Sequence, residues 1–167
     1  MIRYLMMAVF VGAMALNVGC ASKKKVDVGD VESDPSIATK DMAFDPMGSD
    51  SGAISGLSSV NFAYDNSTLT TEARRQLAGN AEWMRNNPNV TVQIEGHCDE
   101  RGSIEYNLAL GERRAQSALN YMVSLGVPAN RLTIISYGKE RPLVPSAQSE
   151  ADHSRNRRAN FVPIPAR

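Results

Sequence analysis

Residues 94–142 decide the fold, and they read IEGHCDERGSIEYNLALGERRAQSALNYMVSLGVPANRLTIISYGKERP. They continue a strand pattern in which Val90, Val92 and Ile94 alternate with polar neighbours. A polar loop follows, and then a predicted helix. The apolar positions of that helix recur at helical spacing, at Ala115, Ala118, Leu119, Met122 and Val123. The stretch therefore predicts a strand and a helix that packs on it.

A second unit of the same kind precedes this stretch. Val60, Phe62 and Tyr64 recur at every second position, which indicates a half-buried strand. Thr70 is predicted to cap a helix, and Pro88 to end it. One face of that helix is apolar, since it carries Ala73, Leu77, Ala81 and Met84 at helical spacing.

Two further strands are expected after the quoted helix. The pattern from Leu132 to Ser136 suggests the first. Residues 158–164 form the second after a polar loop, and Pro163, which lacks an amide donor, favours an edge position for it. Strands that alternate with helices predict an α/β sandwich over residues 57–167, in which helices pack on a mixed sheet.

Residues 1–19 are typical of an export signal, because Arg3 precedes a short apolar stretch that ends in small residues. The apolar run is too short for a permanent transmembrane helix. Gly19 followed by Cys20 resembles the lipobox of bacterial lipoproteins, in which the cysteine is acylated, although Asn17 stands where Leu is usual. Cys20 is therefore the predicted lipid anchor. The alternative is an ordinary secreted protein.

Residues 20–56 are predicted to form a lipidated, disordered tether, since they are mostly polar and keep neither the strand nor the helix period. In lipoproteins of this kind, Ala21 after the cysteine implies export to the outer membrane. With Cys20 acylated, Cys98 has no partner for a disulfide within the chain. The net charge is zero, with 18 basic and 18 acidic side chains, which gives no support to a nucleic-acid partner.

The quoted stretch, together with residues 60–65 and 156–158, resembles the OmpA-like peptidoglycan-binding domain family. The lipobox and the tether agree with the lipoprotein branch of that family, which belongs to the Tol-Pal system, rather than with its porin branch. The resemblance implies a β-α-β-α-β-β domain with a mixed four-stranded sheet. It also implies a lipid-anchored protein on the periplasmic face of the outer membrane, which tethers the membrane to the cell wall and acts in cell division. The implied protein partners are the Tol proteins, especially the periplasmic propeller protein TolB.

The resemblance further implies the ligand and the residues that bind it. The ligand is the diaminopimelate of the peptidoglycan stem peptide, whose side chain ends in an ammonium and a carboxylate. In the family, the Asp of a Gly-His-x-Asp loop and an Arg of the following helix read these charges, and they fall here on Asp99 and Arg114. A second wall of the site corresponds to Asp65, Asn66 and Ser67.

Four more residues complete the expected peptidoglycan-binding set, namely His97, Asn107, Leu110 and Arg158. We expect Asn107 to hold the loop between Gly102 and Gly111 by side-chain hydrogen bonds, and Arg158 to orient Asp99 or to line the rim. A lone His beside a strand end more often satisfies backbone groups than it acts as a base or a metal ligand, so His97 is expected to do the former.

The position of Arg114 leads to a prediction about the helix. One straight helix from Ser103 would carry Arg114 about 16 Å from the loop, at ~1.5 Å per residue. The acidic and basic residues could then not share a ligand. We therefore predict a break at Gly111, which becomes the N-cap of a new helix with Leu110 and Ala115 as its hydrophobic staple.

Two other functions stay open on the sequence alone. The second hypothesis is a protein-interaction module, and the third is an enzyme that acts on the wall, in which Glu95, Asp99 and Glu100 could supply a pair of carboxylates. An Asp beside an Arg stays ionised, whereas a general acid needs a raised pKa, so binding is favoured. Residues 97 and 98 should point to opposite faces of a strand, which argues against a compact His-Cys metal site. No cofactor is expected.

Overall fold

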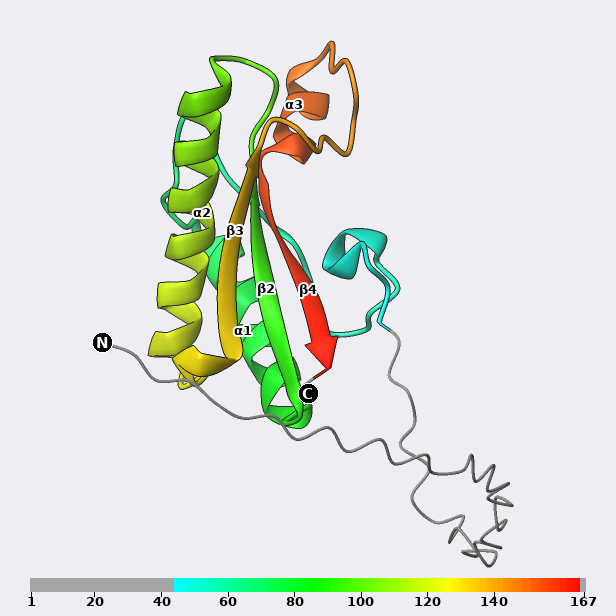
Figure 1. Cartoon of the computed structure of the whole chain (residues 1–167), viewed down its shortest axis with the longest axis vertical. Coiled ribbons are helices and arrows are strands. Elements are labelled where there is room, and N and C mark those ends of the chain that lie inside the picture. Colours follow the sequence, from blue (N-terminus) through cyan, green and yellow to red (C-terminus); the bar gives the residue numbers. More distant parts are fainter. Residues whose placement is uncertain (1–43, 166–167) are drawn as a thin grey trace, which may run out of the picture. The chain divides into compact units, whose positions relative to one another are not determined.

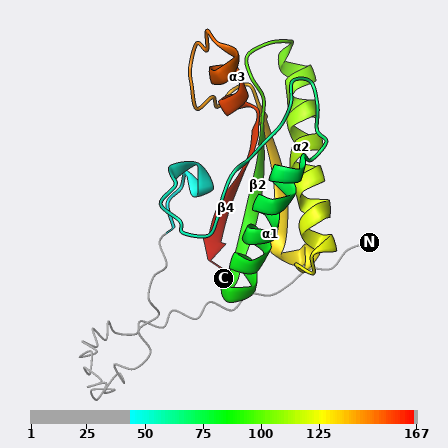
Figure 2. The same cartoon turned by 180° about the vertical axis from the view of Figure 1, so that it is seen from behind.

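The computed structural model describes residues 44–165, which fold around one four-stranded sheet (Figure 1). The strands lie in the order β1, β4, β2, β3. Their bounds are Val60–Asn61 for β1, Val90–His97 for β2, Leu132–Gly138 for β3 and Arg158–Pro165 for β4. The helices are α1 (Thr71–Asn86), α2 (Ile104–Ser124) and α3 (Glu150–Asn156), with two short 3-10 helices, η1 (Gly48–Ser51) and η2 (Ala129–Arg131). The two long helices, α1 and α2, cover one face of the sheet, as the opposite views of Figure 1 and Figure 2 show.

The predicted α/β sandwich with a mixed sheet is confirmed. β2 pairs parallel with β3 and antiparallel with β4, and β4 also pairs antiparallel with β1. The order of elements differs in one place, because the sequence predicts only a polar loop where α3 forms. The start of α3 does carry a capping signal: Ser149 Oγ accepts a hydrogen bond from the Asp152 N–H at 3.2 Å and donates one to Asp152 Oδ2 at 2.7 Å.

The hydrophobic core lies between the sheet and the two long helices. Thr70 caps α1 as predicted, since its side chain accepts a hydrogen bond from the Ala73 N–H at 3.1 Å. The predicted apolar stripe of α1 is buried at all four positions, Ala73, Leu77, Ala81 and Met84. These residues belong to one buried cluster with strand residues that include Val60, Val92, Ile94 and Phe161. Burial of this apolar surface is the main term that holds α1 to the sheet.

The second long helix is continuous, so the predicted break at Gly111 is wrong. α2 runs from Ile104 to Ser124, and Ser103 caps it by accepting a hydrogen bond from the Tyr106 N–H at 3.1 Å. Gly111 has another role, because α2 and β2 approach each other there. The contact leaves no room for side chains between the two elements. α2 therefore lies directly on β2 and runs back along it (Figure 1).

β1 is shorter than the predicted strand. Only Val60 and Asn61 pair with β4, although Phe62 is also buried. The half-buried strand predicted from the sequence includes Tyr64 on its apolar face, but Tyr64 lies beyond β1 and is 59% exposed. The chain turns at Asp65, whose φ of 51° lies in the left-handed region. This turn brings the end of the segment to the surface.

β4 begins inside the sheet, where Ala159 pairs with Val60 on one side and β2 lies on the other. Residues of β4 after Ala159 have no partner in β1, because Val60 is its first residue, and the open side of β4 there faces η1. The Phe161 N–H points to that side and donates to Ser49 Oγ at 3.0 Å. Because a strand alternates, the nitrogen of Pro163 faces the same side, where no ladder bond is lost. The predicted edge position is thus wrong for the start of β4 and agrees with the surroundings of Pro163.

A segment that we call the strap, residues 44–57, carries η1 and lies along β4 (Figure 1). Asn160 Oδ1 accepts hydrogen bonds from Ser49 Oγ at 2.9 Å and from the Asp50 N–H at 3.0 Å. Arg158 Nε donates to Asp50 Oδ2 at 2.8 Å, and both side chains are buried. A buried ion pair and several hydrogen bonds therefore fix the strap to the open side of β4.

The strap moves the boundary of the folded part. The predicted disordered tether of residues 20–56 is wrong for residues 44–56, because their polar groups pair with β4 where β1 no longer does. The predicted signal peptide, the predicted anchor Cys20 and the first part of the tether lie outside the described residues. Within residues 44–165, no helix combines the length and the hydrophobicity needed to cross a membrane.

Candidate binding site

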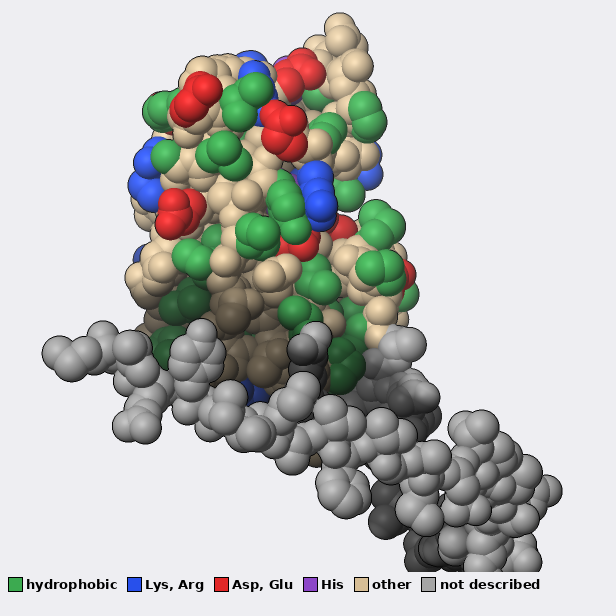
Figure 3. Space-filling model, in the orientation of Figure 1, with side chains coloured by type: hydrophobic (Ala, Val, Ile, Leu, Met, Phe, Trp, Pro, Cys, Tyr) green, Lys and Arg blue, Asp and Glu red, His purple; other side chains and the backbone are tan. Residues whose placement is uncertain are grey.

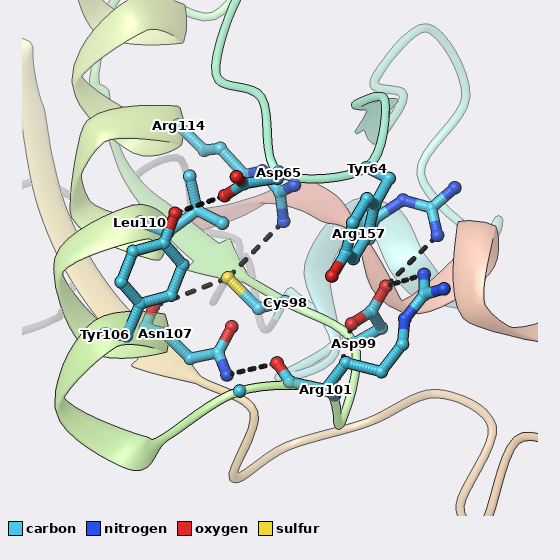
Figure 4. Close-up of a pocket in the computed structure, with 11 residues that line it drawn as sticks. Tyr64, Asp65, Cys98, Asp99, Arg101, Tyr106, Asn107, Leu110, Arg114 and Arg157 are labelled. Atoms are coloured by element: carbon cyan, nitrogen blue, oxygen red, sulfur yellow. Dashed lines mark hydrogen bonds and ion pairs between the residues drawn. The ribbon is translucent and has the colours of Figure 1, made fainter.

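A pocket of about 100 Å³ opens at the end of β2 that is nearest to the start of α2 (Figure 4). Its lining comes from four parts of the chain: Tyr64 and Asp65 after β1, Cys98, Asp99, Arg101 and Gly102 after β2, Tyr106, Asn107, Leu110 and Arg114 on α2, and Arg157 before β4. The tight contact between α2 and β2 positions the helical wall. The pocket therefore depends on the packing of the fold as well as on its loops.

Asp99 is the buried anion of the pocket. Its Oδ2 lies 2.5 Å from Arg101 Nη2 and 3.1 Å from Arg157 Nη1, and its Oδ1 accepts a hydrogen bond from the Arg101 N–H at 3.2 Å. Burial alone would raise the pKa of the Asp99 carboxyl, but the hydrogen bonds from Arg101 and Arg157 lower it below its ordinary value. Asp99 is therefore an ionised carboxylate near neutral pH, which does not suit a general acid.

Arg114 is a fully buried cation of the pocket. Its Nε donates to Asn66 O at 2.8 Å, its Nη1 to His97 O at 2.8 Å and its Nη2 to Ala63 O at 3.1 Å. These carbonyls belong to the loop after β1 and to the end of β2, so the guanidinium ties both to α2. Burial lowers the pKa of Arg114, but from an ordinary value so high that the side chain keeps its charge.

Arg114 and Asp99 share the pocket although α2 does not break. The predicted separation assumed that the loop stays level with the start of the helix. The chain instead continues past the end of β2 before α2 begins, and α2 then runs back along β2 (Figure 1). Arg114 returns in this way to the end of the strand, where its Nη1 lies 3.3 Å from the Sγ of Cys98, the neighbour of Asp99.

The predicted second wall is only partly present in the pocket. Asp65 lines it and accepts a hydrogen bond from the Tyr106 hydroxyl. The backbone carbonyl oxygen of Asn66 accepts a hydrogen bond from Arg114 Nε. The Asn66 side chain closes a turn by accepting a hydrogen bond from the Thr68 N–H at 2.6 Å. Ser67 lies elsewhere, in a shallow groove between α1 and α2. Of these three residues, the structure brings Asp65 into the pocket.

Asn107 and Cys98 join the loop after β2 to α2. Asn107 Nδ2 donates to Arg101 O at 2.8 Å and to Ser103 O at 3.0 Å, so its side chain does bond to backbone groups of the loop before α2. The predicted loop between Gly102 and Gly111 is wrong for most of its length, because α2 begins at Ile104. Cys98 is buried, and its Sγ donates to Asn107 O at 3.4 Å. Burial raises the pKa of the Cys98 thiol, so this residue is not activated as a nucleophile. Leu110 adds an apolar wall.

Arg157, and not Arg158, reaches Asp99. Arg157 Nη1 donates to Asp99 Oδ2 at 3.1 Å, and its Nη2 donates to Glu150 Oε1 at 2.6 Å. Arg158 points to the other face of the sheet and pairs with Asp50, so the prediction that it orients Asp99 or lines the rim is wrong. Successive residues of an extended chain face opposite sides, and the sequence does not tell which of two adjacent arginines faces the pocket.

His97 also lies on the other face, in a second cavity of about 200 Å³. Its ring is buried, and neither ring nitrogen has a hydrogen-bond partner among residues 44–165, although Nε2 lies 3.5 Å from Glu95 Oε2. The prediction that His97 satisfies backbone groups is therefore wrong. Burial lowers the pKa of the His97 imidazole, and Glu95 opposes this effect. In the part of the chain that the structure describes, no group of three or more His, Cys, Asp or Glu side chains is placed to hold a metal ion.

Five side chains of the pocket are missing from the predicted binding set: Tyr64, Cys98, Arg101, Tyr106 and Arg157. The sequence contains a signal for Arg101, because the carboxylate of an Asp in a tight loop often accepts a hydrogen bond from the backbone N–H two residues further on. That bond keeps Arg101 next to Asp99. The Arg101 guanidinium also lies over the Tyr64 ring, at 4.1 Å from its centroid. These contacts depend on the path of two loops, which residue spacing does not reveal.

The pocket places charges of both signs around one small cavity. Asp65 and Asp99 are acidic, whereas Arg101, Arg114 and Arg157 are basic. Such a cavity can bind a ligand that carries both an ammonium and a carboxylate. On the face that Figure 3 shows, acidic and basic side chains are interspersed, so this face carries no broad field of one sign.

The sequence matches known proteins along most of its length. Residues 61–157 match the OmpA family. The peptidoglycan-associated lipoprotein of Brucella melitensis is 40% identical over 146 residues, which cover 86% of this chain and 83% of that protein. The peptidoglycan-associated lipoprotein of Pseudomonas putida is 38% identical over 164 residues, which cover 96% of this chain and 98% of that protein.

Solved structures agree with these matches. The crystal structure of the peptidoglycan-associated lipoprotein from Burkholderia pseudomallei is similar with a TM-score of 0.60 and 35% identity, and the match covers 64% of this chain and 89% of that chain. The C-terminal domain of Helicobacter pylori MotB has a TM-score of 0.60 at 19% identity, which indicates a common fold alone. The chain therefore belongs to the OmpA family, and along nearly its whole length it is similar to the peptidoglycan-associated lipoproteins.

Proposed function

We propose that this protein is an outer-membrane lipoprotein that binds peptidoglycan non-covalently through the diaminopimelate of the stem peptide, and so tethers the outer membrane to the cell wall. The names of relatives that are similar over most of their length support binding to the wall. One observation carries the choice of ligand: Asp99 and Arg114 line the same pocket with opposite charges. A side chain that ends in an ammonium and a carboxylate complements this pair.

In the proposed complex, the ligand ammonium binds at Asp99 and the ligand carboxylate lies toward Arg114. All but one of the N–H groups of Arg114 are engaged by protein acceptors, so its charge attracts the carboxylate mainly from a fixed, buried position. We assign the remaining ligand contacts to Asp65, Asn107 and Leu110, which also line the pocket. Residues that face the second cavity or the groove between the helices are left out of this assignment.

The proposed function breaks no covalent bond. A hydrolase would need one carboxylic acid with a raised pKa, whereas the pKa of Asp99 is lowered. Incubation of the protein with purified wall sacculi should therefore release no soluble fragments. Release of fragments would favour the enzymatic alternative.

The lipid anchor belongs to the same proposal. Acylation of Cys20 would hold the protein in the membrane, because each buried CH₂ contributes about 0.8 kcal/mol and more than one chain gives stable anchoring. Cells grown with labelled palmitate should label the wild-type protein, and should leave Cys20→Ala unlabelled. Fractionation of the same cells should find the wild-type protein with the outer membrane.

We also propose that the Tol proteins, especially TolB, dock on the face that carries the pocket, and that this link serves cell division. The supporting observation is aromatic exposure: Tyr64 and Tyr106 line the pocket, and their side chains are largely exposed. Exposed rings at the mouth of a polar pocket suit a protein partner. Soluble wall fragments should then compete with TolB in a pull-down, whereas independent binding would mean separate surfaces.

A sedimentation assay tests the peptidoglycan site. The full chain should sediment with purified sacculi, and Asp99→Asn should remain in the supernatant while its circular dichroism stays that of the wild type. Arg75→Ala is the matched control, because Arg75 pairs with Glu72 on α1, away from the pocket, and it should sediment normally. Equal sedimentation of all three proteins would contradict the assigned site.

A further inference from the structure

Asp99 has little free capacity for a ligand. Its Oδ2 already faces two guanidinium groups, from Arg101 at 2.5 Å and Arg157 at 3.1 Å, and only 4% of its side chain is exposed. An ammonium group that enters the pocket thus meets a carboxylate whose charge is neutralised. One of the two guanidinium groups has to move before the ammonium can come within hydrogen-bond distance.

The two arginines differ in how firmly they are held. Arg157 is buried, and it also donates from Nε to Phe62 O at 3.1 Å and from Nη2 to Glu150 Oε1 at 2.6 Å. Arg101 is 36% exposed at its side chain, and its Nε has no hydrogen-bond partner among residues 44–165. Withdrawal of Arg101 from Asp99 therefore breaks one side-chain hydrogen bond and leaves Arg157 in place.

Arg101 also has a second acceptor within reach. Its Nη2 lies 3.3 Å from Glu150 Oε2, on a side chain that is largely exposed. The guanidinium rests on the exposed ring of Tyr64, so it can move from Asp99 toward Glu150 and keep this contact. In Figure 4, Tyr64, Arg101 and Arg157 surround Asp99 on one side of the pocket, across from Arg114.

We propose that Arg101 is a latch on the pocket: it occupies the ammonium position at Asp99 in the free protein and moves to Glu150 when a ligand binds. This inference rests on the proposed function and adds an internal competitor to it. The latch keeps the buried carboxylate doubly paired while the pocket is empty, and every ligand that binds through an ammonium has to displace it. Arg101 thus weakens binding, in contrast to the other charged residues of the pocket.

The expected result is a gain of affinity when the latch is removed. Arg101→Ala and Arg101→Gln should bind a soluble diaminopimelate tripeptide with a Kd roughly 3- to 10-fold lower than the wild type, as for an open form populated at about 10–30%. A tripeptide with lysine in the third position has the ammonium but lacks the second carboxylate. It should bind more weakly to every protein, yet gain by the same factor, because the latch competes only for the ammonium position.

Two further variants separate the latch from a general effect of charge. Arg75→Ala removes an exposed arginine that pairs with Glu72 at 2.7 Å, so it has the same change of net charge and should leave both Kd values unchanged. Glu150→Gln removes the second acceptor of Arg101. As a single change, with Arg101 present, it should weaken peptide binding. In the Arg101→Ala background the same change should have a smaller effect, and this coupling can be measured as a double-mutant cycle.

Isothermal titration with the full chain distinguishes the outcomes. Weaker or unchanged binding by both Arg101 variants, with wild-type melting temperatures, would overturn the latch and leave the proposed function standing. A wild-type chain that binds neither the tripeptide nor sacculi would end the proposed function, and the latch with it. A gain limited to the diaminopimelate peptide would also overturn the latch, since Arg101 would then act on the carboxylate.

Discussion

Gly96 of β2 and Gly111 of α2 are in direct backbone contact: a Cβ added to Gly96 would stand 1.8 Å from the carbonyl oxygen of Gly111. A Cβ added to Gly111 would in turn stand 2.3 Å from Ser136 Oγ. Helix and strand approach so closely that Arg114, one turn further along α2, reaches the end of β2. The helical wall of the pocket is therefore positioned by two residues that have no side chain.

This contact can be tested by adding one methyl group. Gly96→Ala should lower the free energy of unfolding by about 3 kcal/mol, because backbone atoms would have to move apart. Gly79→Ala is the matched control within α1, since its added Cβ would meet no described atom within 4 Å outside its own stretch of helix. It should raise the free energy of unfolding by about 0.5–1 kcal/mol, the usual gain of Ala over Gly in a helix. Urea unfolding measures both, and a gain for Gly96→Ala would refute the close contact.

The ionised state of Asp99 should appear in acid unfolding. Its pKa is lowered on folding, so its contribution to stability is present above its unfolded pKa of about 3.9 and is lost as pH falls through the folded value. Asp99→Asn should therefore be less stable than the wild type at pH 7 and should lose less stability below about pH 4. Thermal melting between these conditions gives the comparison. Parallel pH curves for the two proteins would speak against a paired, ionised Asp99.

His97 should act in a higher pH window. Burial lowers the pKa of its imidazole, so the unfolded chain binds a proton first as pH falls below about 6.5, and the free energy of unfolding should decrease. His97→Gln should flatten this part of the curve. The assignment of a neutral, buried His97 fails if this variant keeps the slope of the wild type.

The ion pair between the strap and β4 should contribute strongly to stability. Asp50→Ala leaves the buried guanidinium of Arg158 without its partner and should cost about 3–5 kcal/mol. The double change Asp50→Leu with Arg158→Met should recover most of this loss, because it removes the unpaired charge. Glu72→Ala breaks an exposed pair with Arg75 and should hardly change the melting temperature. A similar small effect for Asp50→Ala would mean that the strap is not fixed by this pair.

The elements of the core could be predicted because each carries its own local signal. The alternation in β2 and the stripe of α1 report which side is buried, and Thr70 marks the start of a helix. The continuity of α2 could not be predicted in the same way. Residue spacing gives the length of a helix but not the direction in which it returns, so Arg114 was placed too far from Asp99 for a straight helix.

Some residues of the pocket could likewise be predicted from local sequence, and others could not. Asp99 and Arg114 could be named from the motif that contains them, whereas the assignment of Arg158 failed, since the side of the sheet that each of two adjacent arginines faces depends on the strand register. The pair of Asp50 and Arg158 joins residues that are 108 positions apart. No local pattern encodes such a pair, and a polar stretch that forms it has the composition of a disordered one.

The strap has a mechanical consequence. A pull on the chain before Phe44 reaches the sheet only after it has acted on the edge-on contact of Phe44 with Trp83 and on the pair of Asp50 with Arg158. A force applied there acts on these attachments before it acts on the core, so we expect them to break first. Peeling residues 44–56 from β4 would add up to about 45 Å of contour length, at ~3.4 Å per residue. The fold thus stores slack that can be released while the hydrophobic core stays intact.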